Sequence, residues 1–112
     1  SMQNLGAYDK FQGNRMVRFL NKMADTQEGE CSMLDNTIVY YGTSNSKTHV
    51  NRNYPLLVAG GNNLGIKHCG FHDFLISGKQ PLCNLYMTFL HSLDVPVQSF
   101  SDSTGMIKQI LG

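Results

Sequence analysis

Two short apolar segments constrain the fold of this chain more than any other feature of its sequence. They are Thr37 to Gly42 (TIVYYG) and Tyr54 to Ala59 (YPLLVA). Both are rich in β-branched, aromatic or aliphatic residues without polar alternation, which is typical of strands covered on both faces. Pro55 fits only at the beginning of its strand, because proline has no N–H to donate to a sheet. The sequence therefore predicts two neighbouring buried strands.

Two amphipathic segments are predicted to form helices that cover these strands. The first, Asn14 to Asp25, places its large apolar side chains in one arc and its basic residues opposite them. Tyr8 extends this pattern toward the N-terminus, although Gly13 interrupts it. The second, Pro81 to Leu93, begins with a proline suited to a first helical turn. Its predicted apolar face consists of Leu82, Leu85, Tyr86, Phe89, Leu90 and Leu93.

The other segments are predicted to be shorter and less regular. Turn-forming residues indicate a connection over Thr26 to Asn36, and Gly65 to Ile76 alternates weakly, as in a short hairpin or a strand and turn. Met106 to Leu111 is expected to form one or two helical turns. This order of elements indicates an α/β layer structure. The predicted fold class is therefore α/β, with a small, incomplete sheet flanked by helices.

The narrowness of the predicted sheet has a structural consequence. Strands of the central type normally lie among neighbours, and two or three strands provide too few. Either further strands come from another chain, or the chain is a piece of a larger domain. We therefore expect an exposed sheet edge that recruits a second copy, giving a homo-oligomer. A compact monomer in which Gly65 to Ile76 caps the edge is the alternative.

Length and composition exclude several classes of protein. The 112 residues suffice for a single domain or domain fragment, in which Ser1 before Met2 is interpreted as a scar of tag removal. An apolar fraction of 41% excludes intrinsic disorder. Nine basic and eight acidic residues give a net charge of +1, which argues against a nucleic-acid partner. No apolar run is long enough to cross a membrane, so no membrane partner is expected.

The three cysteines do not predict a disulfide framework or a zinc site. Cys31, Cys69 and Cys83 are odd in number and lack the closely paired spacing of metal ligands. We interpret them as reduced, partly buried thiols that pack as small apolar groups.

The polar loop Thr43 to Asn53 is the first candidate for a binding site. It follows a buried strand, and ligands of open α/β sheets bind at the carboxyl ends of such strands. An anion or a metal has several candidate partners there: Ser44, Asn45, Ser46, Lys47, His49, Asn51 and Arg52. An exposed connection without a binding function has the same composition and is the alternative interpretation of this loop.

The first predicted helix carries a stripe of basic residues, Arg15, Arg18 and Lys22. We interpret this stripe as a solvated helix face, and contact with a polyanion is the alternative.

The histidines outside this loop are weaker candidates. On a strand, His68 and His72 share a face but lie about 13 Å apart, too far to bind one metal unless a turn intervenes. His91 lies within the second predicted helix, where we expect it to be partly exposed or hydrogen-bonded.

Three stretches of the sequence resemble one known family. EGECSMLDNTIVYYG, NYPLLVAGG and QPLCNLYMTFLHSLDVPVQSFSDSTG are similar to the C-terminal part of the bacterial family called domain of unknown function 1552. That family is related to the alkaline-phosphatase and sulfatase superfamily, and the resemblance extends from about Arg15 to Leu111. It implies that this chain is the C-terminal portion of an alkaline-phosphatase-like domain. In such proteins the strand that bears the nucleophile lies far upstream.

The resemblance also implies where metal ligands are expected. In metal-dependent members of the superfamily, the loop after the DNTIVYYG-like strand carries an Asp-His pair and a further histidine. Here that loop has Ser44-Asn45, and Asn51 stands where a second histidine is expected, so His49 is the one candidate metal ligand. A catalytic zinc takes about three protein ligands. The segment is therefore expected to be non-catalytic and structural, with no cofactor.

Two alternative functions remain open. In the first, the intact parent protein would be a metal-dependent hydrolase of phosphate or sulfate esters, with His49 and its loop lining the site. In the second, the chain would be a self-contained small binding domain.

Overall fold

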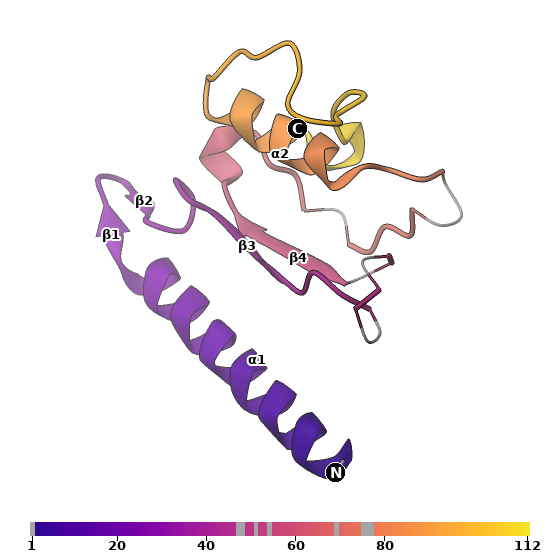
Figure 1. Ribbon diagram of the computed structural model, residues 1–112. Coiled ribbons are helices and arrows are strands. Elements are labelled where there is room, and N and C mark those ends of the chain that lie inside the picture. Colours follow the sequence, from indigo (N-terminus) through magenta and orange to yellow (C-terminus); the bar gives the residue numbers. More distant parts are fainter. Residues whose placement is uncertain (1, 47–48, 51, 54, 69, 75–77) are drawn as a thin grey trace.

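The computed structural model describes residues 2–46, 49–50, 52–53, 55–68, 70–74 and 78–112. The described elements are α1 (Met2–Asp25), β1 (Gln27–Glu28), β2 (Cys31–Ser32), β3 (Ile38–Gly42), β4 (Leu56–Gly60), the 3-10 helix η1 (Asn62–Leu64), α2 (Leu82–Ser92) and the 3-10 helix η2 (Lys108–Ile110). The β3–β4 sheet lies between the two helices, with α1 on one side and α2 on the other (Figure 1). The fold is thus a small mixed α/β arrangement, as predicted. Ser1 falls outside the described residues.

β3 and β4 form an antiparallel pair whose register runs from Ile38 opposite Gly60 to Gly42 opposite Leu56. The prediction that these two segments are neighbouring strands is confirmed. In the described part of the chain they form a sheet of two strands only. A pleated strand directs successive side chains to opposite faces, so Tyr40 lies toward α2 and its neighbour Tyr41 toward α1. The rings of Tyr86 and Phe89 in α2 pack edge-on against Tyr40.

The prediction that both strands are covered on both faces is wrong. Tyr40, Tyr41 and Leu57 have 36%, 42% and 45% of their surface exposed. Tyr41 and Leu57 share the α1 face of the sheet, because they oppose one another in the register. They remain exposed because α1 does not close over them along most of its length. Lateral strands that would bury the edges of this pair are absent from the described residues.

Helix α1 is longer than predicted and packs less. It begins at Met2, so Gly13 lowers its helical propensity without interrupting it. Its one buried side chain is Met23, near its C-terminal end, whereas Phe19 stays about half exposed. The main contact of α1 is with β2, so the prediction that Asn14–Asp25 covers the two predicted strands is not confirmed. The basic residues Arg15, Arg18 and Lys22 are exposed, as expected for a solvated face.

The segment after α1 begins with a small hairpin rather than an irregular connection. β1 and β2 pair antiparallel, with Glu28 opposite Cys31. Gly29 in the turn has a φ of 66°, a left-handed conformation that glycine adopts without strain. Thr26 ends the helix, since its hydroxyl donates to the carbonyl of Lys22 and its own carbonyl accepts from the N–H of Met33.

The predicted apolar face of α2 is confirmed in part, since Leu85 is buried and Tyr86 and Phe89 pack against Tyr40, but the helix buries a second side as well. Its buried side chains are Asn84, Leu85, Met87 and Thr88, and Leu93, just beyond its end, is 51% exposed. The reason is that the chain returns after α2 and places the buried Ile107 against this side of the helix. The predicted helical turn within Met106–Leu111 is confirmed by η2.

The hairpin predicted for Gly65 to Ile76 does not form among its described residues. Instead, Ile66 makes an antiparallel bridge with Leu111. The N–H of Lys67 donates to the carbonyl of Ile110, and the N–H of Gly112 donates to Gly65. Ile66 is thereby buried against the C-terminal segment instead of pairing within its own stretch. Leu75 and Ile76 lie outside the described residues.

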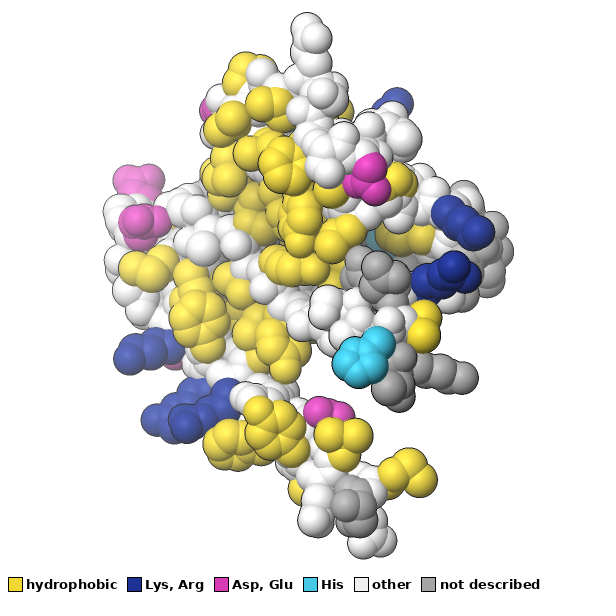
Figure 2. Space-filling model, in the orientation of Figure 1, with side chains coloured by type: hydrophobic (Ala, Val, Ile, Leu, Met, Phe, Trp, Pro, Cys, Tyr) yellow, Lys and Arg dark blue, Asp and Glu magenta, His cyan; other side chains and the backbone are white. Residues whose placement is uncertain are grey.

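Among the described residues, few apolar side chains are buried. The buried apolar side chains are Met23, Ile66, Leu85, Met87 and Ile107. Figure 2 shows apolar side chains spread over the surface between the upper part of the molecule and α1. The radius of gyration is 15.7 Å, against about 13 Å for a compact domain of the same length. Among the described residues, no helix combines the length and apolarity that a membrane span requires.

Candidate functional site

The loop that contains His49 connects the two strands of the β3–β4 hairpin. The N–H of Ser46 donates to the carbonyl of Val50 over 2.9 Å, which closes part of the loop on itself. The hydroxyl of Thr43 donates to the carbonyl of Asn45 and accepts from the N–H of the same residue. His49 itself is exposed and has a φ of 57°. Lys47 and Asn51 lie outside the described residues.

The antiparallel pairing changes the argument for a ligand site in this loop. The rule that ligands bind at carboxyl ends of strands applies to parallel sheets, where several such ends meet at one edge. Here the loop leaves the end of β3 and returns to the beginning of β4. No second strand of the described residues delivers its carboxyl end beside it.

Across the described parts of the chain, no three His, Cys, Asp or Glu side chains are grouped so that they hold a metal ion. The assignment of His49 as a metal ligand therefore stays a prediction. Cys31 and Cys83 are free and half-buried, as predicted for packed thiols, and Cys69 lies outside the described residues.

The other histidines contact the protein itself. His68 Nε2 lies 2.8 Å from the carbonyl oxygen of Gly60, at the end of β4. His72 stacks on Phe74 with 6.2 Å between ring centroids. His91 Nε2 lies 2.9 Å from the carbonyl oxygen of Val97, which confirms the prediction of a hydrogen-bonded histidine in this helix.

A first cluster of polar residues, here named the Asp35 junction, joins the β1–β2 hairpin to η1. It consists of Ser32, Asp35, Asn36, Asn62 and Asn63. One carboxylate oxygen of Asp35 accepts from the hydroxyl and N–H of Ser32, and the other accepts from the Asn62 amide over 2.8 Å. Hydrogen bonds from Ser32 and then Asn62 favour the ionised carboxylate, so they lower the pKa of Asp35 below its ordinary value.

Backbone contacts reinforce the Asp35 junction. The N–H of Gly61 donates to the carbonyl of Leu34, and the N–H of Asn63 donates to that of Asp35. The side-chain amide of Asn63 donates to Asn36 over 2.7 Å. The segments before β3 and after β4 are thus held together, which fixes the base of the hairpin opposite the His49 loop.

A second cluster, the α2–tail network, joins α2 to the C-terminal segment. It consists of Gln80, Asn84, Thr88, Thr104 and Ile107. The side-chain amide of Asn84 donates to Gln80 and Thr104, and its oxygen accepts from the N–H of Thr104. The hydroxyl of Thr88 donates to the carbonyl of Asn84 and accepts from the N–H of Ile107 over 2.8 Å.

Every side-chain hydrogen-bonding group of Asn84 has a partner, and the Thr88 hydroxyl both donates and accepts. Asn84 is 2% exposed and Thr88 is fully buried, so these bonds lie in a region of low dielectric where an unpaired polar group is costly. Sequence reasoning missed both residues. The available signal was their spacing, because two polar residues at positions i and i+4 of an otherwise apolar helix share one face.

An open cleft of about 1940 Å³ lies at β4. Leu56, Leu57 and Val58 contribute to its lining, so it reaches both faces of the strand. Leu5 of α1 lines it as well, together with an apolar group from the α2 side of the sheet. That group comprises Ile66, Leu82, Leu85, Ile107 and Ile110.

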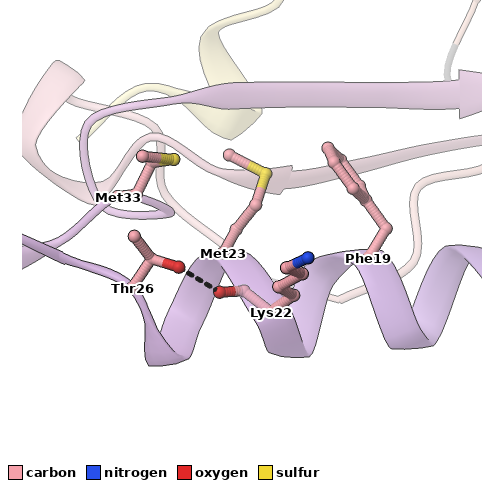
Figure 3. Close-up of a pocket in the computed structure, with 5 residues that line it drawn as sticks. All are labelled: Phe19, Lys22, Met23, Thr26 and Met33. Carbon is pink, nitrogen blue, oxygen red and sulfur yellow. Dashed lines mark hydrogen bonds between the residues drawn. The ribbon is translucent and has the colours of Figure 1, made fainter.

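A second, smaller hollow of about 390 Å³ lies where α1 meets β2. Phe19, Met23 and Met33 line it (Figure 3). Thr26 and Lys22 line it as well, and the Thr26 hydroxyl donates a hydrogen bond to the Lys22 carbonyl oxygen. Its walls offer a sulfur-rich apolar surface rather than groups for catalysis.

Comparison with protein-family models, with curated proteins and with solved structures finds no match to this chain.

Proposed function

We propose that this chain is a non-catalytic structural segment from the C-terminal part of an alkaline-phosphatase-like protein. In this role β3, β4 and their two helices form one part of a wider α/β layer structure. The observation that carries the proposal is the open apolar cleft at β4, in a chain that exposes much more surface than a closed domain does.

The exposed area can be compared with what a compact protein of this mass shows. The accessible surface is 8402 Å², whereas a closed monomer of 12.5 kDa exposes about 6,200 Å². The excess of roughly 2,200 Å² is of the size that a domain loses when further layers pack on it. An incomplete sheet accounts for this excess, since both the strand edges and the helix faces turned toward the missing strands stay open.

The hydrogen-bonded polar residues support a structural role. The Asp35 junction fixes the base of the β3–β4 hairpin, and the α2–tail network fixes the C-terminal segment on α2. The buried α2–tail network satisfies its polar groups internally. The side chains of the Asp35 junction are hydrogen-bonded mainly to one another, so both clusters support a stabilising role.

The resemblance of the three quoted stretches to an alkaline-phosphatase-like family supports the proposed identity of the larger fold. In that family the nucleophile precedes this region, and the loop after the β3-like strand supplies metal ligands. Ser44 and Asn45 occupy the positions of the Asp-His pair, so the segment supplies at most His49 to such a site.

An ester-hydrolysis assay tests the proposal. The purified chain is incubated with p-nitrophenyl phosphate or p-nitrophenyl sulfate, alone and with Zn²⁺, Mg²⁺ or Ca²⁺. We expect no turnover above the buffer rate with any metal, because a nucleophile with an activating base or metal is required for this chemistry.

The His49→Ala variant is the matched control. Metal-dependent hydrolysis by the wild type that disappears in His49→Ala would contradict the proposal and favour the metal-dependent hydrolase. Equal background rates in both proteins are the expected result.

A further inference from the structure

We propose that the outer edge of β4 is an interface for a second copy of this chain, which adds its own β4 antiparallel to form a four-stranded sheet. The order of strands across the dimer is β3–β4–β4–β3. The inference concerns this chain by itself: in the parent protein of the proposed function, further strands of that protein would occupy the same edge, so the dimer is the state in which the edge is closed without them.

The first argument is the shape of the site. β4 has one strand neighbour within the described chain, and the large cleft lies along it. Leu57 projects into the cleft on the α1 face, and Leu56 and Val58 project on the α2 face. Apolar side chains of an added strand meet these three residues, whereas Asp9, Arg52, Lys67, Asp73 and Lys79 place charges elsewhere on the walls of the same cleft.

The second argument is that β4 is itself such a strand. Its sequence, Leu56 to Gly60, is LLVAG, with apolar residues on both faces and none of the charged side chains or prolines that guard edge strands. Two identical antiparallel edges meet around a two-fold axis, which is the commonest symmetry of soluble oligomers. A second copy therefore supplies an occupant whose chemistry fits the cleft.

The third argument is the position of α1. A two-fold axis perpendicular to the sheet keeps both copies of α1 on one face of the four-stranded sheet. In each copy Leu5 faces the cleft while 61% exposed, and Tyr8 and Phe11 are also more than half exposed. The added strand and the second α1 provide these side chains with apolar neighbours.

The fourth argument is area. A standard protein–protein interface removes about 800 Å² from each partner, and obligate dimers remove more. The excess exposed surface of roughly 2,200 Å², summed over the whole chain, exceeds this area, and the part of it at Leu5 and Leu57 borders the cleft.

Sedimentation velocity over a range of micromolar concentrations tests the proposal. We expect the wild type to sediment at twice the chain mass of 12.5 kDa. Leu57→Lys replaces an apolar side chain of β4 with a charged one in both copies, which edge strands use to prevent the addition of another strand. It is expected to weaken dimerisation by about 100-fold or more, leaving a monomer.

Leu5→Glu provides a second variant, at a position that the fold of the monomer does not use because Leu5 is mostly exposed. It is also expected to give a monomer. Leu93→Lys is the matched control, since Leu93 is 51% exposed but does not line the cleft. This variant is expected to remain dimeric, and far-UV circular dichroism is expected to be the same for all four proteins.

A wild type that stays monomeric throughout the range overturns the proposal. A dimer that survives both Leu57→Lys and Leu5→Glu, or that Leu93→Lys disrupts equally, shows that another surface associates and also overturns it. None of these outcomes bears on ester hydrolysis, so the two proposals fail separately.

Discussion

Gly60, the last residue of β4, combines a left-handed backbone with a crowded environment. Its φ is 75°, and a Cβ at this position would meet the carbonyl oxygens of Leu34 and Thr37. These two carbonyls belong to the turn that leads into β3, so Gly60 lets the strand end pass close to the Asp35 junction. The crowding cannot be relieved by rotating a side chain alone, because the two nearest opposing atoms are backbone oxygens; the third is Cδ1 of Leu34.

Gly60→Ala is therefore expected to destabilise the protein by about 3 kcal/mol, from left-handed strain and from the steric clash. Gly65→Ala is the matched control, because Gly65 has a similar φ of 77° with open space around its Cβ position. It is expected to cost only about 1 kcal/mol. Urea unfolding measures both, and equal losses would contradict the crowded geometry at Gly60.

At the scale of elements, local periodicity predicts the existence of the helices and strands better than it predicts what they bury. The apolar spacing of Asn14–Asp25 and the β-branched run at Thr37–Gly42 depend on neighbouring residues, so both are visible in the sequence. The face that α2 buries depends instead on Thr104 and Ile107, which lie 20 and 19 residues from their partners Asn84 and Thr88. No local pattern encodes such a return of the chain.

Dependence on distant residues also explains why the hairpin expected at Gly65 to Ile76 and the parallel-sheet interpretation of the His49 loop were wrong. Gly65 to Ile76 alternates weakly, yet Ile66 pairs with Leu111 from the far end of the sequence. The polar loop around His49 was compared with loops of parallel sheets, and strand direction is set by tertiary pairing rather than by composition. The candidate site was thus predictable as a polar loop but not as a hairpin connection.

The α2–tail network makes a prediction at this scale. Thr88→Val keeps the shape of the side chain but removes the hydroxyl, which leaves the buried N–H of Ile107 without its acceptor. The free energy of unfolding is expected to fall by about 2 kcal/mol. Thr43→Val, at an exposed threonine of the His49 loop, is the control and is expected to change it by less than about 0.5 kcal/mol. Similar losses in chemical denaturation would show that the network does not hold the tail.

At the scale of the whole molecule, the sequence already indicated that two strands are too few for the apolar residues they carry. The structure adds a physical measure of this deficit. A radius of gyration of 15.7 Å and an accessible surface of 8402 Å² both exceed the values of a closed domain of this size. The sequence predicts an exposed sheet edge but not which of the two edges it is, because that depends on how the segments after β4 and the two helices pack around the strands.

The central claim is that β4 is an open edge completed by another strand, and residue-resolved amide hydrogen exchange tests it most directly. In an antiparallel strand, alternate N–H groups point away from the existing partner, so half of the β4 amides face the edge. The measurement compares the wild type with Leu57→Lys at a concentration where the wild type is associated. Amides of Asn84 to Thr88 in α2 serve as the internal control.

We expect the outward amides of Leu56 to Gly60 to exchange slowly in the wild type and much faster in Leu57→Lys, with α2 protected equally in both proteins. That result would show that another strand is hydrogen-bonded to the outer edge of β4. Equal exchange of the β4 amides in the two proteins, with α2 protection intact, would contradict the account.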